Sequence, residues 1–384
     1  MKLLLVQESD WLKRNQHQQH HLAELMSLKG HEIRVIDFPI TWREESEQVL
    51  WSNREVYPDV KKIYDGAKAT VIRPGFVHLP ILEYISLMWT HYREIQQQLR
   101  EFEPDVVVGF GILNSWIASR ICGNTPFVYY WIDVLHELIP AAPFRWLGRL
   151  MERATLHKAI RTLAINKNLR DYMEDLSGKR TGLLGAGVSI FHFNKLNTIL
   201  NRETMRKAYD VKENNILLFF MGWLYSFSGL AEVITSMKHR ADKVKLLIVG
   251  DGDDYKRLAT IRRELNLENR VFLAGKVGYD EIPKYIAAAD VCILPAYPEH
   301  RIMKHIVPIK IYEYMAMGKP VLSTKLPAVI SEFGDDGIVY VDKPEDMVSA
   351  SMDMRVAVDI QKIQGWGTIA NKFETILKGL CLKL

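Results

Sequence analysis

The stretch Pro308–Thr324, PIKIYEYMAMGKPVLST, predicts a short helix that leads directly into a buried strand. Pro308 suits the first turn of a helix because it has no N–H to leave unpaired and its φ is preset. Gly318 can take the left-handed conformation that ends helices, and Pro320 prevents the helix from continuing. Residues 321–324 (VLST) then read as a short buried strand. This order of elements is typical of an α/β fold.

Two charged residues in the predicted helix indicate a possible nucleotide site. The start of a helix favours anions, because free N–H groups and the positive end of the dipole point the same way. Lys310 adds a full positive charge there, and Glu313 offers acceptor oxygens that could hold two neighbouring sugar hydroxyls. A diphosphate beside a ribose would use all of these features. An amphipathic helix with a solvated lysine and glutamate would explain the same pattern.

The pattern P-x-K-x-x-E-Y-M-A-x-G-x-P resembles the donor-site motif of retaining GT-B glycosyltransferases of the family-4 type, the glycosyl transferases group 1. The resemblance implies that Glu313 binds the ribose of a nucleotide-sugar, and that Ile309 and Lys310 also lie at the donor. Two further runs resemble the second-domain core of these enzymes, LLIVGDGDDYKRL at 246–258 and NRVFLAGKVGYDEIPKYIAAADVCILP at 269–295.

Glycines and one valine in these runs are further donor-site candidates. By themselves Gly250 and Gly252 are a weak dinucleotide signal, because the third glycine of a dehydrogenase fingerprint is absent, and simple turn chemistry would also explain them. The resemblance implies that they lie near the nucleotide, together with Gly222 and Val277.

The chain departs from the family pattern in three places. Family members carry an arginine and a lysine that neutralise the donor diphosphate, whereas residues 222–229 read GWLYSFSG. His305 stands where the family has a paired glutamate, and 8–11 (ESDW) replace a glycine-rich loop. A leaving diphosphate needs positive charge where negative charge develops. We therefore expect Lys310 to supply that charge with Arg301 or Lys304, although the last two could be solvated loop residues.

Apolar runs alternate with helical stretches in both halves of the chain. The first half has candidate strands at 2–6, 32–37, 69–72, 105–108, 126–131, 161–165 and 181–184, and the second at 216–221, 245–249, 271–274, 291–294, 321–324 and 338–341. This pattern predicts two Rossmann-like doubly wound parallel-sheet domains facing a cleft. We expect an acceptor-side domain at 1–193, completed by the C-terminal helix 362–384, and a donor-binding domain at 205–361. The charged run 41–65 is expected to be irregular, and Gly379 to end the last helix.

Two predicted helices of the first half are amphipathic. The helix at 82–102 should face the core with Ile85, Met88, Tyr92, Ile95 and Leu99. A basic helix at 143–158 places arginines at four-residue steps opposite Phe144, Leu147, Leu150, Met151 and Ala154. Such a helix could lie on an anionic membrane surface. A surface helix packed on the sheet is the slightly favoured alternative.

Candidate catalytic residues follow the strand 126–131, at the carboxyl end where open α/β sheets place their sites. The resemblance implies a histidine just after this strand, and counting places Ile132 or Asp133 there. Asp133 could stabilise charge or act as an acceptor base, and His136, one turn on, could donate a hydrogen bond to the sugar or phosphate. A helix cap and a packed loop histidine are the alternatives.

Composition excludes several other classes of protein. The 384 residues are 48% hydrophobic and 25% charged, and a formal charge of +4 does not favour nucleic acid as a partner. The longest apolar stretch, 216–224, is shorter than the roughly 20 residues of a membrane-spanning helix. Three separated cysteines lack metal or disulfide spacing, and His17, His20 and His21 read more simply as polar helix residues than as metal ligands. We expect a cytoplasmic protein that could bind peripherally at the inner face of the cell membrane.

These features together predict a glycosyltransferase. It would move a sugar from a nucleoside diphosphate to a hydroxyl of a glycan or lipid-linked acceptor, with retention, without an obligatory metal or other cofactor, in glycan, glycolipid or cell-surface polysaccharide biosynthesis. A non-catalytic partner subunit of the same fold, binding a nucleotide or another transferase, is the alternative that the missing cations favour.

Overall fold

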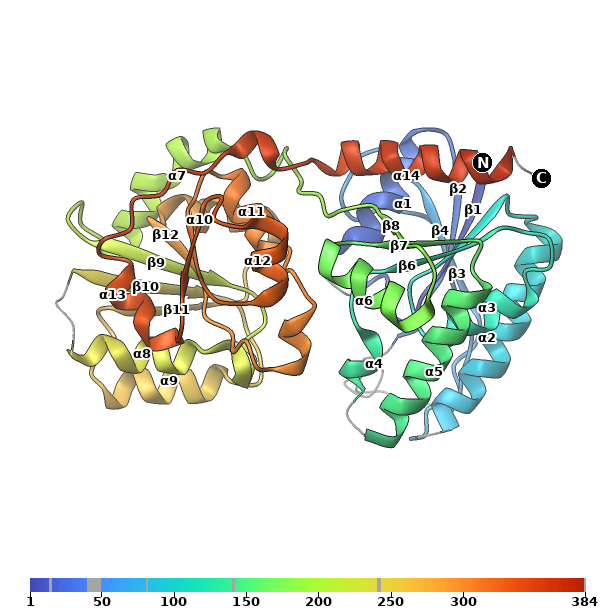
Figure 1. Ribbon diagram of the computed structural model, residues 1–384, viewed down its shortest axis with the longest axis horizontal. Coiled ribbons are helices and arrows are strands. Elements are labelled where there is room, and N and C mark those ends of the chain that lie inside the picture. The colour runs from blue at the N-terminus through green and yellow to red at the C-terminus, as the bar shows by residue number, and fades with distance from the viewer. Residues whose placement is uncertain (14–15, 40–49, 81, 140–141, 240–242, 383–384) are drawn as a thin grey trace. The chain divides into compact units, whose positions relative to one another are not determined.

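The computed structural model describes residues 1–13, 16–39, 50–80, 82–139, 142–239 and 243–382. The chain forms two compact units, Met1–Gly185 with Trp366–Leu384, and Ala186–Gly365 (Figure 1). Each unit is built on its own sheet, so the predicted class of two Rossmann-like α/β domains with parallel sheets is confirmed.

The first unit contains an eight-stranded sheet in the order β3-β4-β2-β1-β5-β6-β7-β8. Its strands are β1 (Lys2–Val6), β2 (Glu32–Ile36), β3 (Glu55–Val60), β4 (Ala69–Arg73), β5 (Val106–Gly109), β6 (Phe127–Trp131), β7 (Arg161–Ala164) and β8 (Gly182–Leu183). All neighbours are parallel except β3, which pairs antiparallel with β4 at the edge. The central strands are apolar on both faces, as expected where helices cover both sides of a sheet.

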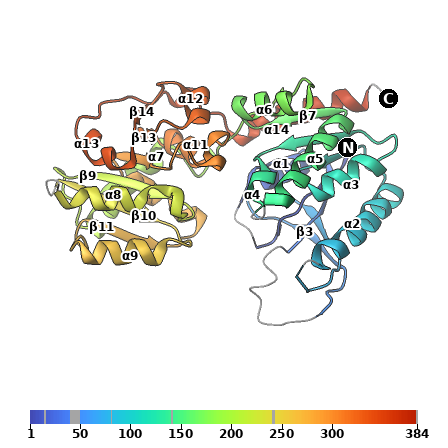
Figure 2. The same ribbon diagram turned by 60° about the horizontal axis from the view of Figure 1, so that its bottom comes forward.

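Helices α1 (Gln18–Leu28), α2 (Leu82–Glu101), α3 (Leu113–Ile121), α4 (Leu135–Leu138), α5 (Ala142–Lys158), α6 (Lys167–Ser177) and α14 (Trp366–Cys381) complete this unit. Right-handed crossovers place α2, α3 and α5 together, because each connects strands in the same direction across the sheet. Figure 2 shows these three helices side by side, with α3 between the other two. The C-terminal helix α14 packs on α1, where the ring of His21 stacks on Trp366 at 4.8 Å.

The second unit has six parallel strands in the order β11-β10-β9-β12-β13-β14. These are β9 (Ile216–Met221), β10 (Val244–Val249), β11 (Val271–Gly275), β12 (Val291–Leu294), β13 (Val321–Thr324) and β14 (Ile338–Val341). The helices are α7 (Lys195–Ala208), α8 (Leu230–Ser236), α9 (Tyr255–Glu264), α10 (Ile282–Ala288), α11 (Lys310–Ala316), α12 (Pro327–Phe333) and α13 (Met347–Ala350). All six residues of β10 are buried, and each fully buried large apolar side chain stabilises the unit by about 1.5–3 kcal/mol.

The opening stretch folds as its residues predict. Helix α11 follows Pro308 and leads into β13, all four residues of which are buried. Gly318 has φ +71° and ends the turn between them. The phenol of Tyr314 accepts a hydrogen bond from the backbone N–H of Met221 at 3.0 Å, which attaches α11 to the end of β9.

Three sequence-based expectations differ from the structure. The run 41–65 contains the edge strand β3, although residues 41–49 of it lie outside the described residues. Gly379 lies inside α14 and does not end it. Residues 186–193 belong to the second unit, because the backbone of Val188 pairs with the segment at Gly365.

The expected core-facing side of α2 was wrong. Of the five apolar residues assigned to it, only Ile95 is buried, while Ile85, Met88 and Tyr92 are exposed. The buried side carries Glu83, Leu87, His91, Glu94, Ile95 and Gln98. These polar groups are hydrogen-bonded: Glu94, for example, accepts a two-pronged hydrogen bond from Arg54 and a third bond from Gln98, one turn further along α2. Buried polar side chains that are hydrogen-bonded can therefore replace an apolar stripe.

Candidate functional site

Glycine turns of the second unit meet at the carboxyl ends of β9 and β10. A Cβ at Gly250 would lie 1.9 Å from the carbonyl oxygen of Gly222, and a Cβ at Gly252 would lie 2.5 Å from the amide nitrogen of Leu224. The φ angles of the three glycines are +128° for Gly222, +142° for Gly250 and +156° for Gly252. Only glycine allows two backbone loops to cross this closely. The turns lie beside the point where the strand order reverses, between β9 and β12, and the N–H groups of the three glycines are themselves hydrogen-bonded within the chain.

The ammonium group of Lys310 reaches this crossing. Its Nζ lies 2.7 Å from the position that a Cβ of Gly222 would occupy, and 4.1 Å from the ring centroid of Phe220. Burial lowers the pKa of Lys310 to about 8, although nearby Glu313 opposes the shift. Within the described part of the chain, no hydrogen bond or ion pair holds this Nζ. A mostly protonated amine therefore stands at the glycine turns with its hydrogen bonds unused.

The carboxyl group of Glu313 lies one turn further along α11. It is 8% exposed and accepts a hydrogen bond from the phenol of Tyr279 at 3.1 Å. Burial raises the pKa of Glu313 to about 7, against the effects of Tyr279 and Lys310. The hydroxyl of Tyr279 is therefore bonded to an oxygen that could otherwise accept a ligand hydroxyl.

The loop after β11 brings Tyr279 to this position. Val277 lies in the same loop and is half-buried. The ring of Tyr279 packs edge-on against Phe193, with centroids 5.4 Å apart, and against His192 at 5.7 Å. Tyr279 thus links the start of the second unit to Glu313.

The loop before α11 holds the remaining predicted donor residues. Arg301 and Lys304 are exposed at the two ends of the 3₁₀ turn η5 (Arg301–Lys304), and His305 and Ile309 are half-buried after it. His300, just before the turn, stacks on Phe227 with centroids 4.0 Å apart and 10° between the planes. The structure thus brings Gly222, Gly250, Lys310 and Glu313 together, and places Arg301 and Lys304 on a separate surface turn.

An aromatic row takes the place of the missing cationic element. The rings of Tyr225 and Phe227 stack at 4.7 Å and 11°, continuing the stack on His300. Trp223 stands beyond Tyr225, is 52% exposed, and donates from Nε1 to Asp253 at 3.3 Å. Where the family carries an arginine and a lysine, this chain thus has stacked aromatic side chains, beginning one residue after Gly222.

In the first unit, Asp133 and His136 follow β6 as predicted, but in different environments. Asp133 accepts a hydrogen bond from the N–H of Val134 at 2.7 Å, and burial raises its pKa to about 6. His136 is 2% exposed, with Nδ1 bonded to Glu152 and Nε2 lying 3.2 Å from the hydroxyl of Tyr172. Both ring nitrogens of His136 are therefore engaged within the fold.

A third carboxyl group, that of Glu8, lies at the switch point of this sheet, the place between β1 and β5 where the strand order reverses. The Oε1 of Glu8 accepts a hydrogen bond from the N–H of Asn114 at 2.6 Å, in the first turn of α3. Burial raises the pKa of Glu8 to about 7, and the charge of Glu152 adds to the shift, while backbone N–H groups oppose it. A carboxylate of the chain itself thus occupies the N-terminal end of α3.

Sequence reasoning did not identify Glu8, Glu152, Tyr172 or Tyr279 as functional candidates. Glu152 lies in the basic helix and gave no sign of burial, because the helix was oriented by its apolar residues. Tyr279 lies within the quoted run 269–295, but its hydrogen bond depends on a contact 34 residues away in sequence. No local signal in the sequence could have found it.

In the described chain, no three His, Cys, Asp or Glu side chains gather as metal ligands would. His20 and His21 instead bond to the carbonyl of Trp11 at 3.1 Å and the hydroxyl of Tyr64 at 2.9 Å. The described helices also include none with the length and apolar character to cross a membrane.

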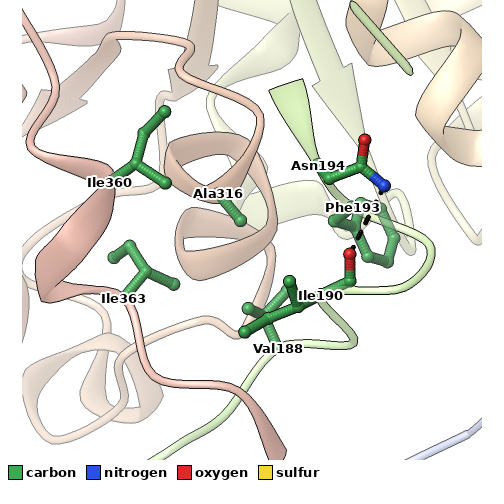
Figure 3. Close-up of a pocket in the computed structure, with 7 residues that line it drawn as sticks. All are labelled: Val188, Ile190, Phe193, Asn194, Ala316, Ile360 and Ile363. Atoms are coloured by element: carbon green, nitrogen blue, oxygen red, sulfur yellow. Dashed lines mark hydrogen bonds between the residues drawn. The ribbon is translucent and has the colours of Figure 1, made fainter. Parts of the chain in front are cut away.

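A small cavity of about 120 Å³ lies behind α11 in the second unit (Figure 3). Its lining is mostly apolar, and the only polar side chain, Asn194, donates to the carbonyl of Ile190 at 3.4 Å. The lining residues are Val188, Ile190, Phe193, Asn194, Ala316, Ile360 and Ile363. This volume is well below the roughly 300 Å³ at which ligand pockets begin, so the pocket is too small to hold a nucleotide.

Comparison with family models matches both units. Residues 215–354 match the model described as Glycosyl transferases group 1, and residues 16–183 match the Glycosyl transferase 4-like domain. The matched regions are the two α/β sheets described above.

Curated relatives are similar at low identity. The putative teichuronic acid biosynthesis glycosyltransferase TuaC of Bacillus subtilis (strain 168) is 26% identical over 237 residues, which are 61% of this chain and 57% of that protein. The alpha-monoglucosyldiacylglycerol synthase of Streptococcus pneumoniae is 21% identical over 272 residues, 68% of this chain and 60% of that protein. The chain thus spans less than two thirds of the length of these relatives.

Solved structures share the whole fold. Sucrose-phosphate synthase from Thermosynechococcus elongatus superposes with a TM-score of 0.73 at 16% identity, covering 100% of both chains. HepE from Anabaena, in complex with UDP, gives a TM-score of 0.62 at 17% identity and covers 99% of this chain and 95% of its own.

Proposed function

The chain belongs to the glycosyl transferases group 1 family of GT-B glycosyltransferases, and from this premise we propose that it transfers a sugar from a nucleoside diphosphate to an acceptor hydroxyl. The proposed acceptor is a glycan or a lipid-linked glycan of cell-surface biosynthesis, the setting named for TuaC, and the proposed outcome is retention of configuration.

The pairing of Lys310 with Glu313 on α11 is the observation that carries this proposal. The ammonium group of Lys310 lies at the glycine turns over the ring of Phe220, without a hydrogen bond or ion pair to the described residues, while Glu313 is one helical turn away. A diphosphate at the turns would accept hydrogen bonds from Lys310, and a ribose would donate its hydroxyls to Glu313. The HepE complexes with UDP and UDP-glucose show that a protein of this fold holds such a donor.

Charge neutralisation is the main catalytic task proposed for the second unit. As the bond between sugar and phosphate breaks, negative charge grows on the diphosphate, and a fixed cation stabilises it most where water is excluded. With a pKa of about 8, Lys310 remains mostly protonated at neutral pH. We assign it the role of the missing arginine and lysine, with Arg301 or Lys304 as a second source of charge.

Asp133 is the proposed group of the first unit that faces the reacting sugar. Its pKa of about 6 suits a carboxylate that accepts a proton near neutrality. His136 is held by Glu152 and Tyr172, so we propose that it positions the turn after β6 and takes no part in proton transfer. No step of this proposal requires a metal ion, and turnover should persist in EDTA.

A non-catalytic partner subunit is the second candidate. The aromatic row at Trp223 replaces the cations of the family, and the hydrogen bond from Tyr279 occupies Glu313. A protein without sugar-transfer activity would need neither the cations nor a Glu313 carboxylate free to bind a ribose. This candidate predicts nucleotide binding without turnover, or no binding.

A thermal-shift screen with UDP, GDP, ADP, dTDP and CMP separates these candidates, with Glu313→Ala measured beside the parent chain. A ligand that binds only the folded state stabilises it by about 2.7 kcal/mol at a hundred times its Kd. We expect one diphosphate to raise the Tm of the parent and not of the variant, and its sugar conjugate to be turned over. If no diphosphate raises the Tm of the parent, the donor site is refuted; if one does but no sugar conjugate is consumed, the partner subunit is favoured.

A further inference from the structure

Helix α2 presents its apolar side to solvent. Tyr84, Ile85 and Trp89 are 48%, 60% and 55% exposed, and Leu82, Met88 and Tyr92 are exposed beside them. The side that faces the sheet carries two buried glutamates, Glu83 and Glu94. A helix of a soluble domain usually has the opposite orientation, with charged residues outward.

Helix α5 has the same orientation. Phe144 and Trp146 are 61% and 67% exposed, and Leu147 and Leu150 are also exposed. Its buried residues include Gly148 and Glu152. A Cβ at Gly148 would lie 2.8 Å from Ile139, and Glu152 bonds to His136, so these contacts hold the polar side inward. Helix α5 is therefore a surface helix packed on the sheet, the alternative favoured from the sequence. It packs through Gly148, Glu152 and Leu156, however, while Phe144, Leu147 and Leu150 face solvent.

Between these helices, α3 adds a half-buried tryptophan, Trp116. The guanidinium of Arg120 lies over its ring at 4.0 Å, and on α2 the guanidinium of Arg93 lies over Trp89 at 4.9 Å. Tryptophan and arginine thus stand together on adjacent helices of one layer (Figure 2).

Charge is segregated across the same layer. The helices α2, α3 and α5 contain four acidic residues, of which Glu83, Glu94 and Glu152 are buried and only Glu101 is exposed. Exposed arginines lie on all three helices: Arg93, Arg100, Arg120, Arg149 and Arg153. The outer face is therefore basic as well as apolar, a combination that complements an anionic surface with an apolar interior.

The apolar residues gather toward one edge of the sheet. Helices that follow parallel strands begin at the carboxyl edge. The exposed aromatic and aliphatic residues lie in the first halves of α2 (82–92) and α5 (144–150), at that edge, whereas the arginines continue along the helices. Glu8, Asp133 and His136 follow β1 and β6 at the same edge.

We propose that α2, α3 and α5 form a docking face for an anionic lipid bilayer. The exposed aromatic and aliphatic side chains enter the interface between headgroups and acyl chains, where tryptophan and tyrosine are favoured. The arginines contact anionic headgroups, adding attraction that falls with salt. Docking would bring the carboxyl edge of the first unit to the lipid surface. It does not require the proposed sugar transfer.

Flotation of the full chain with vesicles tests the proposal. Vesicles of phosphatidylcholine alone would be compared with vesicles that also contain phosphatidylglycerol, at low and high salt. We expect the chain to float with the anionic vesicles and to be released as salt rises. The double variant Phe144→Ser/Trp146→Ser should lower the partition coefficient by roughly tenfold or more, since each buried aromatic anchor contributes to interfacial binding.

Ile160→Ser is the matched control. Ile160 is 57% exposed in the same unit but precedes β7, at the opposite edge of the sheet, so this variant should float like the parent. Arg149→Gln/Arg153→Gln should weaken flotation with anionic vesicles only. All variants should keep the Tm of the parent and its response to nucleotide, because the residues are exposed and lie outside the nucleotide site.

Three results would overturn the proposal. The first is a parent chain that does not float with anionic vesicles at low salt, and the second is a Phe144→Ser/Trp146→Ser variant that floats as well as the parent. The third is sedimentation velocity that shows a dimer of the parent, lost in that variant without vesicles, which would assign the face to a second copy of the chain.

Discussion

The switch points of the two sheets differ in what the chain places there. Between β1 and β5 of the first unit, the carboxyl group of Glu8 bonds to the first turn of α3. Beside the switch point of the second unit, which lies between β9 and β12, two glycine turns cross closely, and Lys310 brings an ammonium group to them. Sheets of the same design thus end in a carboxyl group of the chain in one unit, and in the other in an ammonium group that makes no hydrogen bond to the described residues.

This difference indicates at which of the two sheets an anionic ligand can bind to the carboxyl edge. Open α/β sheets offer backbone N–H groups at the switch point, and any nearby anion can use them. In the first unit Glu8 already does so. In the second unit no carboxylate among the described residues bonds to Lys310, which is why we propose the diphosphate site there.

Among the variants that test this comparison, Gly250→Ala should have the largest effect on nucleotide binding and stability. The new Cβ would meet the carbonyl oxygen of Gly222 at 1.9 Å, at a φ of +142°, so the backbone must move. We expect nucleotide binding to be lost and the free energy of unfolding, measured by urea denaturation, to fall by about 3–4 kcal/mol.

Gly111→Ala is the matched substitution in the first unit. Its Cβ would meet the carboxyl oxygen of Glu8 at 2.8 Å, and a side chain can shift where a backbone cannot. A cost of about 1 kcal/mol with nucleotide binding intact is expected. Equal effects of the two alanines would contradict the contrast.

Lys310→Met should weaken nucleotide binding by roughly 10- to 100-fold, the value of one or two hydrogen bonds to a charged group. Methionine keeps most of the chain over Phe220 while removing the charge. Calorimetric titration with the diphosphate identified by the screen measures the change in Kd. Lys256→Met, at an exposed lysine of α9, should bind as the parent does. An unchanged Kd in Lys310→Met would remove this lysine from the site.

Glu8→Gln should change how stability depends on pH, without affecting nucleotide binding. The pKa of Glu8 is raised from 4.5 to about 7, so the folded state favours its neutral form. The stability that this gives is complete below pH 4.5 and is lost as the pH rises through 7. In the parent chain, the free energy of unfolding measured by urea denaturation should therefore fall between pH 5 and pH 8. In the variant this fall should be smaller by about 1–2 kcal/mol. The exposed Glu101→Gln serves as control, and an identical pH dependence in Glu8→Gln would refute the assignment.

The smallest expected effect is the pH dependence of nucleotide binding. Glu313 accepts ribose hydroxyls best when ionised, so affinity should rise severalfold as the pH increases through about 7. It should fall again above about 8, where Lys310 loses its proton. Titrations between pH 6 and 9 would show a bell-shaped curve, and Lys310→Met should lack the upper limb. A flat profile in the parent chain would contradict both assignments.

Much of the fold followed from the sequence because its signals are local. Residues 3–6 (LLLV) and 216–221 (ILLFFM) are continuous apolar runs, and such runs are buried whichever helices cover them. The turn at Gly318 was recognised for a similar reason, since few residues other than glycine adopt its φ readily. The resemblance at 308–320 indicated both the family and the pairing of Lys310 with Glu313.

Only the tertiary structure decided which way several side chains face. The spacing of apolar residues along α2 is the same whether they face the sheet or the solvent. The hydrogen bonds of Glu94 and His91 show that the polar side faces the sheet. The partners of His136 and Glu313 are likewise distant in sequence. Sequence determined which segments form helices and strands, because backbone preferences are local. Tertiary structure determined what each side chain meets, because a partner far along the chain sets its burial, its pKa and its availability to a ligand.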